Sequence, residues 1–93
     1  MADANGWHFE IANTGKTDLD RLDAATRRRV LEKLVWFADN FQNSTPLPLG
    51  GRWRGFFKLR IGDWRVVYGV NNNTRRITVY AIDNRNKIYK RRV

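Results

Sequence analysis

The chain has 93 residues, of which 42% are hydrophobic, and this suits one compact domain with a single core. It contains no cysteine and one histidine, which excludes a disulfide framework and a thiolate metal site, so we expect no metal and no cofactor. No apolar run is long enough for a signal peptide or a membrane span, so we expect a cytoplasmic protein without a membrane partner. We expect residues 1–93 to form one domain, with 1–6 and 91–93 mobile.

Positive charge is concentrated in the C-terminal half of the chain. Residues 1–51 contain six Lys or Arg and seven Asp or Glu, whereas residues 52–93 contain twelve Lys or Arg and two Asp. The net charge is therefore −1 for the first part and +10 for the second. A merely soluble basic surface would explain the total but not the segregation, so we expect the C-terminal half to face a polyanion, with nucleic acid as the favoured partner.

The first half of the sequence predicts one strand and two helices. Residues 7–11 alternate apolar and polar side chains and predict a short strand, and 16–22 predict a short helix. Asp23 is a suitable N-cap for a longer helix over 24–41. Three-and-four spacing predicts a buried stripe on that helix, with the neighbouring arginines on a solvated face; the stripe comprises Val30, Leu31, Leu34, Phe37, Ala38 and Phe41.

The second half predicts an antiparallel sheet. Residues 44–51 contain two prolines and two glycines and predict a loop, and strands are expected over 53–61, 64–70 and 75–83. Turns are expected at 62–63 and 71–74. The predicted fold class is α+β, with two N-terminal helices packed on one face of a small, mainly antiparallel sheet.

The first hairpin has one apolar face and one basic face. A two-residue turn at 62–63 opposes Phe57 to Tyr68, Leu59 to Val66 and Ile61 to Trp64, all on the face toward the helices. Trp53 is expected on this same face. The other face then carries Arg60 opposite Arg65, with four further side chains on the same side and no acidic group: Arg54, Lys58, Thr78 and Tyr80.

Most polar sheet faces are simply solvated, but they usually mix positive and negative side chains. Two like charges directly opposed across strands destabilise a sheet by roughly 0.2–1 kcal/mol. The Arg60–Arg65 pair should lower stability by this amount without a structural benefit, so we interpret the face as a binding or catalytic site. A register slip of one residue would invert the assignment.

The motifs of this half resemble those of a known family. KLRIGDWRVVY at 58–68 and ITVYAIDNRNKIYKR at 77–91 are similar to the RelE branch of the RelE/ParE toxin superfamily. The segment LDRLDAATRRRVLEKL and the PLPLGG loop before the hairpin extend the resemblance over nearly the whole chain. It implies a RelE-like fold and the toxin of a type II toxin–antitoxin system, a metal-independent endoribonuclease that cuts mRNA in the ribosomal A site. An acidic cognate antitoxin is the implied second partner, in a toxin–antitoxin hetero-oligomer.

By this resemblance, five residues form the catalytic set: Lys58, Arg60, Arg65, Arg85 and Tyr89. The implied reaction is attack of a ribose 2′-hydroxyl on the adjacent phosphate. Arginines suit the developing charge on that phosphate, because a guanidinium matches phosphate oxygens and stays protonated. Further RNA contacts are expected from Arg54, Tyr80, Lys87, Lys90, Arg91 and Arg92.

Two positions depart from the family pattern, and the alternatives stay open. Many relatives have a Gly-His pair where this chain has Asp83-Asn84, and some have a lysine where it has Phe56. The groups that transfer protons in the reaction are therefore not assigned. The alternatives are a ParE-like inhibitor of DNA gyrase and a noncatalytic RNA-binding module or decayed toxin.

Overall fold

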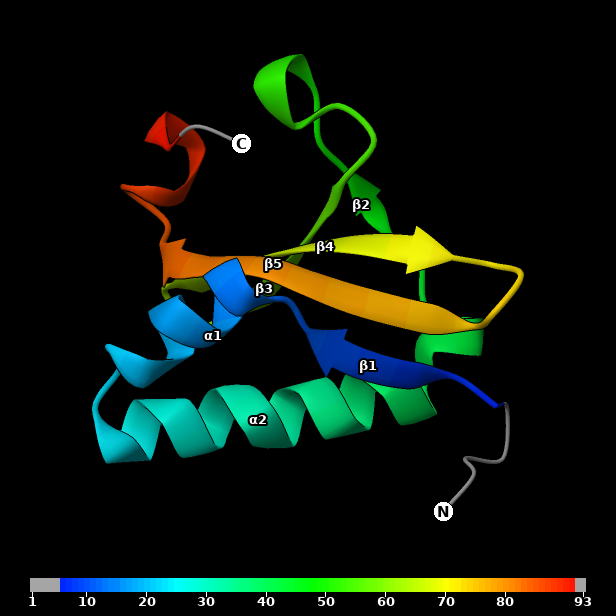
Figure 1. Ribbon diagram of the computed structural model, residues 1–93, viewed down its shortest axis with the longest axis horizontal. Coiled ribbons are helices and arrows are strands. Elements are labelled where there is room, and N and C mark those ends of the chain that lie inside the picture. Colours follow the sequence, from blue (N-terminus) through cyan, green and yellow to red (C-terminus); the bar gives the residue numbers. More distant parts are fainter. Residues whose placement is uncertain (1–5, 92–93) are drawn as a thin grey trace.

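The structure is a computed structural model that describes residues 6–91. Five strands form one sheet in the order β1-β5-β4-β3-β2, and β1 pairs parallel with β5 while the other neighbouring pairs are antiparallel. Two helices cover one face, and a loop and the C-terminal segment lie on the opposite side (Figure 1). The elements are β1 (His8–Ile11), α1 (Asn13–Asp20), α2 (Ala24–Asp39), β2 (Leu47–Pro48), β3 (Phe57–Ile61), β4 (Trp64–Asn71) and β5 (Arg76–Asn84). The predicted α+β class is confirmed.

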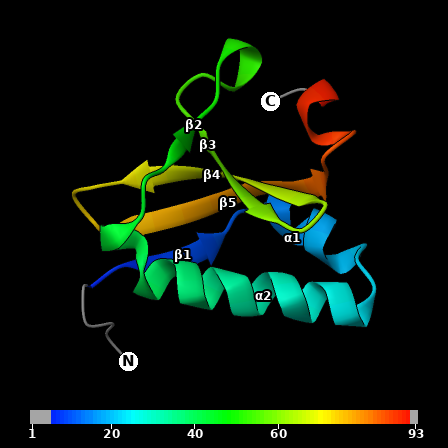
Figure 2. The same ribbon diagram turned by 180° about the vertical axis from the view of Figure 1, so that it is seen from behind.

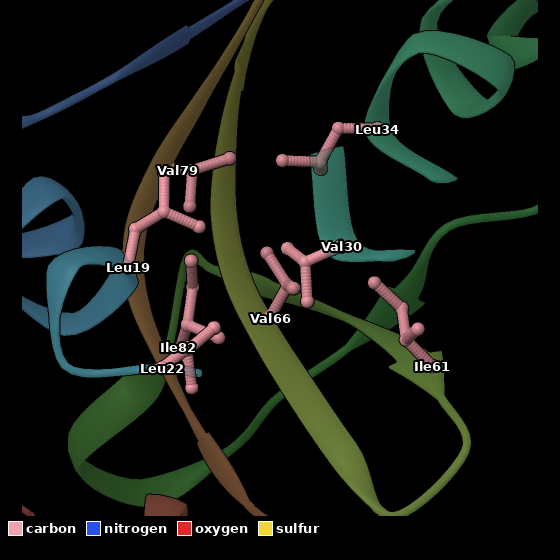
Figure 3. Close-up of a cluster of buried hydrophobic side chains, with 8 residues drawn as sticks. All are labelled: Leu19, Leu22, Val30, Leu34, Ile61, Val66, Val79 and Ile82. Atoms are coloured by element: carbon pink, nitrogen blue, oxygen red, sulfur yellow. The ribbon is translucent and has the colours of Figure 1, made fainter. Parts of the chain in front are cut away.

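The long helix begins and packs as its sequence indicates. Asp23 accepts a hydrogen bond from the Thr26 backbone N–H at 3.1 Å, which caps α2, and the hydrogen bonds from Thr26 lower the pKa of Asp23. The apolar stripe of α2 meets β3, β4 and β5 in a core that also contains Leu19 of α1 and Leu22 of the turn after it (Figure 3). This cluster comprises Leu19, Leu22, Val30, Leu34, Ile61, Val66, Val79 and Ile82.

A second cluster continues the helix-side core toward the end of α2. Phe37, Phe41 and Tyr68 pack edge to face, and Trp7 joins them with its ring centroid 4.5 Å from that of Phe41. Tyr68 is 1% exposed, and burial raises its pKa to about 12.

One helix arginine differs from the expectation. Arg27 was expected on a solvated face, but its guanidinium donates to the carbonyl oxygens of Leu19, Asp20 and Leu22. The Leu19 and Asp20 oxygens lie in the last turn of α1, where helix carbonyls lack partners within the helix, and Leu22 lies in the turn between the two helices. Arg27 therefore joins the two helices.

The hairpin register is the predicted one. Phe57 pairs with Tyr68, Leu59 with Val66 and Ile61 with Trp64. A bulge between Val67 and Tyr68 then shifts the pairing with β5, so that Val67 opposes Ala81 while Tyr68 opposes Val79.

The face away from the helices is not the open surface that the sequence suggested. The strand expected to start at 53 begins at Phe57; the residues before it form two short 3-10 turns, η1 (Phe41–Asn43) and η2 (Gly51–Trp53), with β2 between them. Trp53 was expected among the helix-side aromatics, but it packs with Val67, Ala81 and Ile88 on the opposite face. A further 3-10 turn, η3 (Ile88–Lys90), covers the other edge of this small core. Figure 2 shows η2 and the C-terminal segment on the same side of the sheet.

The region that the structure describes contains no helix long and apolar enough to cross a membrane. Among the same residues, no group of three or more His, Cys, Asp or Glu side chains is arranged to hold a metal ion.

Candidate nucleic-acid interface

A cleft opens between η2 and η3 on the face away from the helices. Its volume is about 630 Å³ and it is lined by Leu49, Gly50, Gly51, Arg52, Trp53, Lys58, Tyr89 and Lys90. We call this set the basic cleft, because three cations and no carboxylate are among its lining residues. Arg52 lines the cleft although no sequence pattern singled it out.

Lys58 and Tyr89 are the two predicted catalytic residues that meet in the basic cleft. Lys58 lies on β3 opposite Val67, on the face away from the helices, and its Nζ lies 5.9 Å from the centroid of the Tyr89 ring. Tyr89 lies in η3, is 39% exposed and lines the cleft. A cation beside an accessible aromatic ring can hold a phosphate and an unstacked base together.

The other three predicted catalytic residues gather around the hairpin turn at 62–63. Arg60 is exposed and lies opposite Arg65, as predicted. The Nη1 atom of Arg65 donates to the Gly62 and Trp64 carbonyl oxygens at 2.8 and 2.9 Å, so this side chain folds back on the turn. The Arg85 backbone N–H donates to the Asp63 carbonyl oxygen at 2.8 Å, which holds Arg85 beside the same turn.

The expectation that this face carries no acidic group is wrong. Asp83 is the cross-strand neighbour of Arg65, and Asp63 lies with its Oδ1 3.9 Å from Arg85 Nε. The two carboxylates offset part of the charge at the turn. The structure therefore separates a carboxylate-free cleft from a turn region of mixed charge.

Arg91 was expected in a mobile tail but makes two ion pairs. Its Nη1 donates to Asp18 Oδ2 at 2.8 Å and lies 3.4 Å from Asp83 Oδ2. The hydrogen bond that Arg91 donates to the Asp18 carboxylate is the main cause that raises the pKa of Arg91. No sequence pattern singled out Asp18, because its cationic partner lies 73 residues away.

The remaining RNA-binding candidates have different surroundings. Arg54 and Lys87 are exposed, and Lys90 lines the basic cleft. Tyr80 is 37% exposed and packs edge to face on Phe56, with ring centroids 5.3 Å apart. Arg92 lies outside the described residues.

Comparison with known proteins identifies the family. Residues 9–89 match the family model described as the ParE toxin of type II toxin–antitoxin systems, parDE. The chain belongs to this toxin family. Toxin RelE of Mycobacterium tuberculosis is 28% identical over 90 residues, which cover 97% of this chain and 93% of that protein. The predicted RelE/ParE superfamily is thereby confirmed, with its RelE-type members among the relatives.

Solved structures show the same fold. The M. tuberculosis RelBE2 toxin–antitoxin complex contains a chain that superposes with a TM-score of 0.75 at 20% identity, covering 85% of this chain and 98% of that one. A mutant of the Escherichia coli toxin RelE in the free state gives a TM-score of 0.71 at 16% identity, covering 96% of this chain and 90% of that one. The predicted RelE-like fold is confirmed by both.

Proposed function

We propose that this toxin is a ribosome-dependent endoribonuclease that cuts mRNA in the A site and so inhibits translation. The observation that carries the proposal is the basic cleft, where Lys58 and Tyr89 meet beside Arg52 and Lys90 without a lining carboxylate. Such a cleft suits a single-stranded polyanion with accessible bases, because cations contact its phosphates while an aromatic ring stacks on a base. mRNA in the decoding site has this form.

The proposed reaction needs three contributions from the protein. A base takes the proton of the 2′-hydroxyl, which attacks the phosphorus; the bond to the 5′-oxygen breaks; and that oxygen receives a proton. The products are a cyclic phosphate and a free 5′-hydroxyl, so no water is consumed. Lys58 and Tyr89 are the proton-transfer candidates in the cleft, and Arg60, Arg65 and Arg85 supply positive charge from the turn region.

The proposed protein partner is an acidic antitoxin. The net charge of +10 over residues 52–93 supports it, since charge complementarity accelerates encounter and gives it a strong salt dependence. The RelBE2 structure is a toxin–antitoxin complex, and by analogy we infer a hetero-oligomer in the cytoplasm.

A gyrase-inhibiting, noncatalytic toxin is the second candidate. The matching family model is that of a ParE toxin, and neither a histidine nor a carboxylate lines the basic cleft as a general base. Asn84, at a position where many RelE relatives carry histidine, accepts a hydrogen bond from the Asn86 N–H and cannot exchange protons.

Induced expression in cells without the antitoxin separates the two candidates. We expect translation to stop first, with mRNA cut inside coding regions when 5′ ends are mapped, while DNA synthesis continues. Cells expressing Lys58→Met at the same level should keep their mRNA intact. Arrested DNA replication with intact mRNA would overturn the nuclease proposal in favour of gyrase.

A further inference from the structure

The C-terminal segment that carries Tyr89 is attached to the sheet at two points. Ile88 is fully buried against Trp53, Val67 and Ala81, and its burial fixes the start of η3. Arg91, three residues later, fixes the end by its contacts with Asp18 and Asp83. Tyr89 and Lys90 lie between these anchors and form one wall of the basic cleft.

The Arg91 anchor is built around a buried carboxylate. Asp18 is 6% exposed and accepts two hydrogen bonds at Oδ2, from the Ile82 backbone N–H at 2.9 Å and from Arg91 at 2.8 Å. A buried carboxylate without a cation is costly, whereas a charge-assisted hydrogen bond is among the stronger contacts in proteins. The pair therefore joins α1, β5 and the C-terminal segment at one place.

We propose that Arg91, held by Asp18 and Asp83, is a positioning residue that sets the place of Tyr89 over Lys58. This inference rests on the proposed function, because it concerns the same cleft. The alternative is that Arg91 contacts a phosphate directly. Its side chain is 32% exposed and shares Nη1 between two carboxylates, whereas Lys90 and Arg85 are exposed and better placed to meet a phosphate first.

Three variants and one control test the proposal. Arg91→Met removes the cation and keeps much of the side-chain length; Asp18→Asn keeps an oxygen for Ile82 but removes the charge; Arg91→Lys keeps the charge. Arg76→Met is the control, because Arg76 also forms an ion pair, with Glu10 Oε1 at 2.6 Å, but at the end of β5 that is far from η3.

One readout is the ¹⁹F NMR signal of fluorotyrosine at Tyr89, assigned with Tyr89→Phe. The others are single-turnover mRNA cleavage and binding on programmed ribosomes.

Arg91→Met and Asp18→Asn should both shift the Tyr89 signal and slow cleavage about tenfold to a hundredfold, the scale for a misplaced catalytic group. Ribosome binding should change less than about threefold, Arg91→Lys should restore part of the rate, and Arg76→Met should behave as wild type. In a Tyr89→Ala background, Arg91→Met should cause no further loss, because residues that act through one another are not additive.

An unchanged Tyr89 signal in folded Arg91→Met protein would overturn the proposal. So would weaker ribosome binding in Arg91→Met together with unchanged or tighter binding in Asp18→Asn, which frees the guanidinium for a phosphate. If Arg91→Met does not fold, Asp18→Asn and Arg91→Lys give the same decision. If wild-type protein never cleaves mRNA, the nuclease proposal fails alone, and the NMR signal still decides whether Arg91 positions Tyr89.

Discussion

The two faces of the sheet are buried in different ways. On the helix side, α1 and α2 cover two connected clusters of aliphatic and aromatic side chains. On the other side, Val67 of β4 and Ala81 of β5 are covered by Trp53 of η2 and Ile88 of η3, each from a single 3-10 turn. Stability is thus concentrated on the first face, which leaves the second free to expose cations and an aromatic ring at the rim of a small core. Low local stability is common where a protein binds its ligands.

Truncating one large buried side chain on each face should give the largest difference in stability between the two faces. Leu34→Ala should lower the free energy of unfolding by about 2–5 kcal/mol, because Leu34 is 1% exposed and leaves a cavity in the main core. Ile88→Ala should instead release η3 locally, so that hydrogen exchange at the Lys90 amide accelerates more than global unfolding does. Chemical denaturation with hydrogen-exchange mass spectrometry measures both. Equal losses of global stability would show that the two cores unfold as one unit.

The buried Tyr68 on the helix side should make the stability of the protein depend on alkaline pH. Burial raises the pKa of Tyr68 to about 12, so the folded chain holds this proton more tightly than the unfolded chain, where the pKa is 10.0. The stabilisation is complete below pH 10 and is lost as the pH rises toward 12, by about 2–3 kcal/mol at two pKa units. Denaturation at pH 8 and pH 11.5 should show this alkaline loss in wild type and a smaller one in Tyr68→Phe. Identical losses in both proteins would show that the alkaline loss of stability comes from groups other than Tyr68.

The smallest expected effect is a gain in stability on the second face. Arg60→Thr removes a like-charge pair with Arg65 and should raise the free energy of unfolding by about 0.2–1 kcal/mol. The gain should shrink in high salt, since exposed charges are screened. Urea denaturation at two ionic strengths measures it. A loss of stability at both ionic strengths would show that the packing of the Arg60 side chain outweighs its repulsion from Arg65.

The sequence predicted those parts of the fold that depend on neighbouring residues. Alternation and the Gly62–Asp63 turn were sufficient for the register of β3 with β4, and three-and-four spacing was sufficient for α2. The parallel pairing of β1 with β5 joins segments about 68 residues apart, which no local pattern specifies.

The site was predicted less completely than the fold. Trp53 was misplaced because strand alternation was continued back through Gly55, although its φ of 94° marks a break that favours glycine. Ile88, an apolar residue inside a basic segment, was the available signal for the second core. Asp18 gave none, because its partners Ile82 and Arg91 are brought to it only by the tertiary fold. The catalytic and RNA-binding assignments stay predictions.

The central claim is that the second face carries catalysis at the basic cleft, and Lys58→Met tests it most directly. Single-turnover cleavage of mRNA on programmed ribosomes should fall about a hundredfold or more, the scale for losing a positioned proton-transfer group. Binding to the same ribosomes should fall much less, because other cations remain on this face. Arg76→Met, which removes a cation from the end of β5 far from η3, should cleave at the wild-type rate. Equal loss of binding and cleavage in Lys58→Met, or wild-type protein that binds without cutting, would contradict the account.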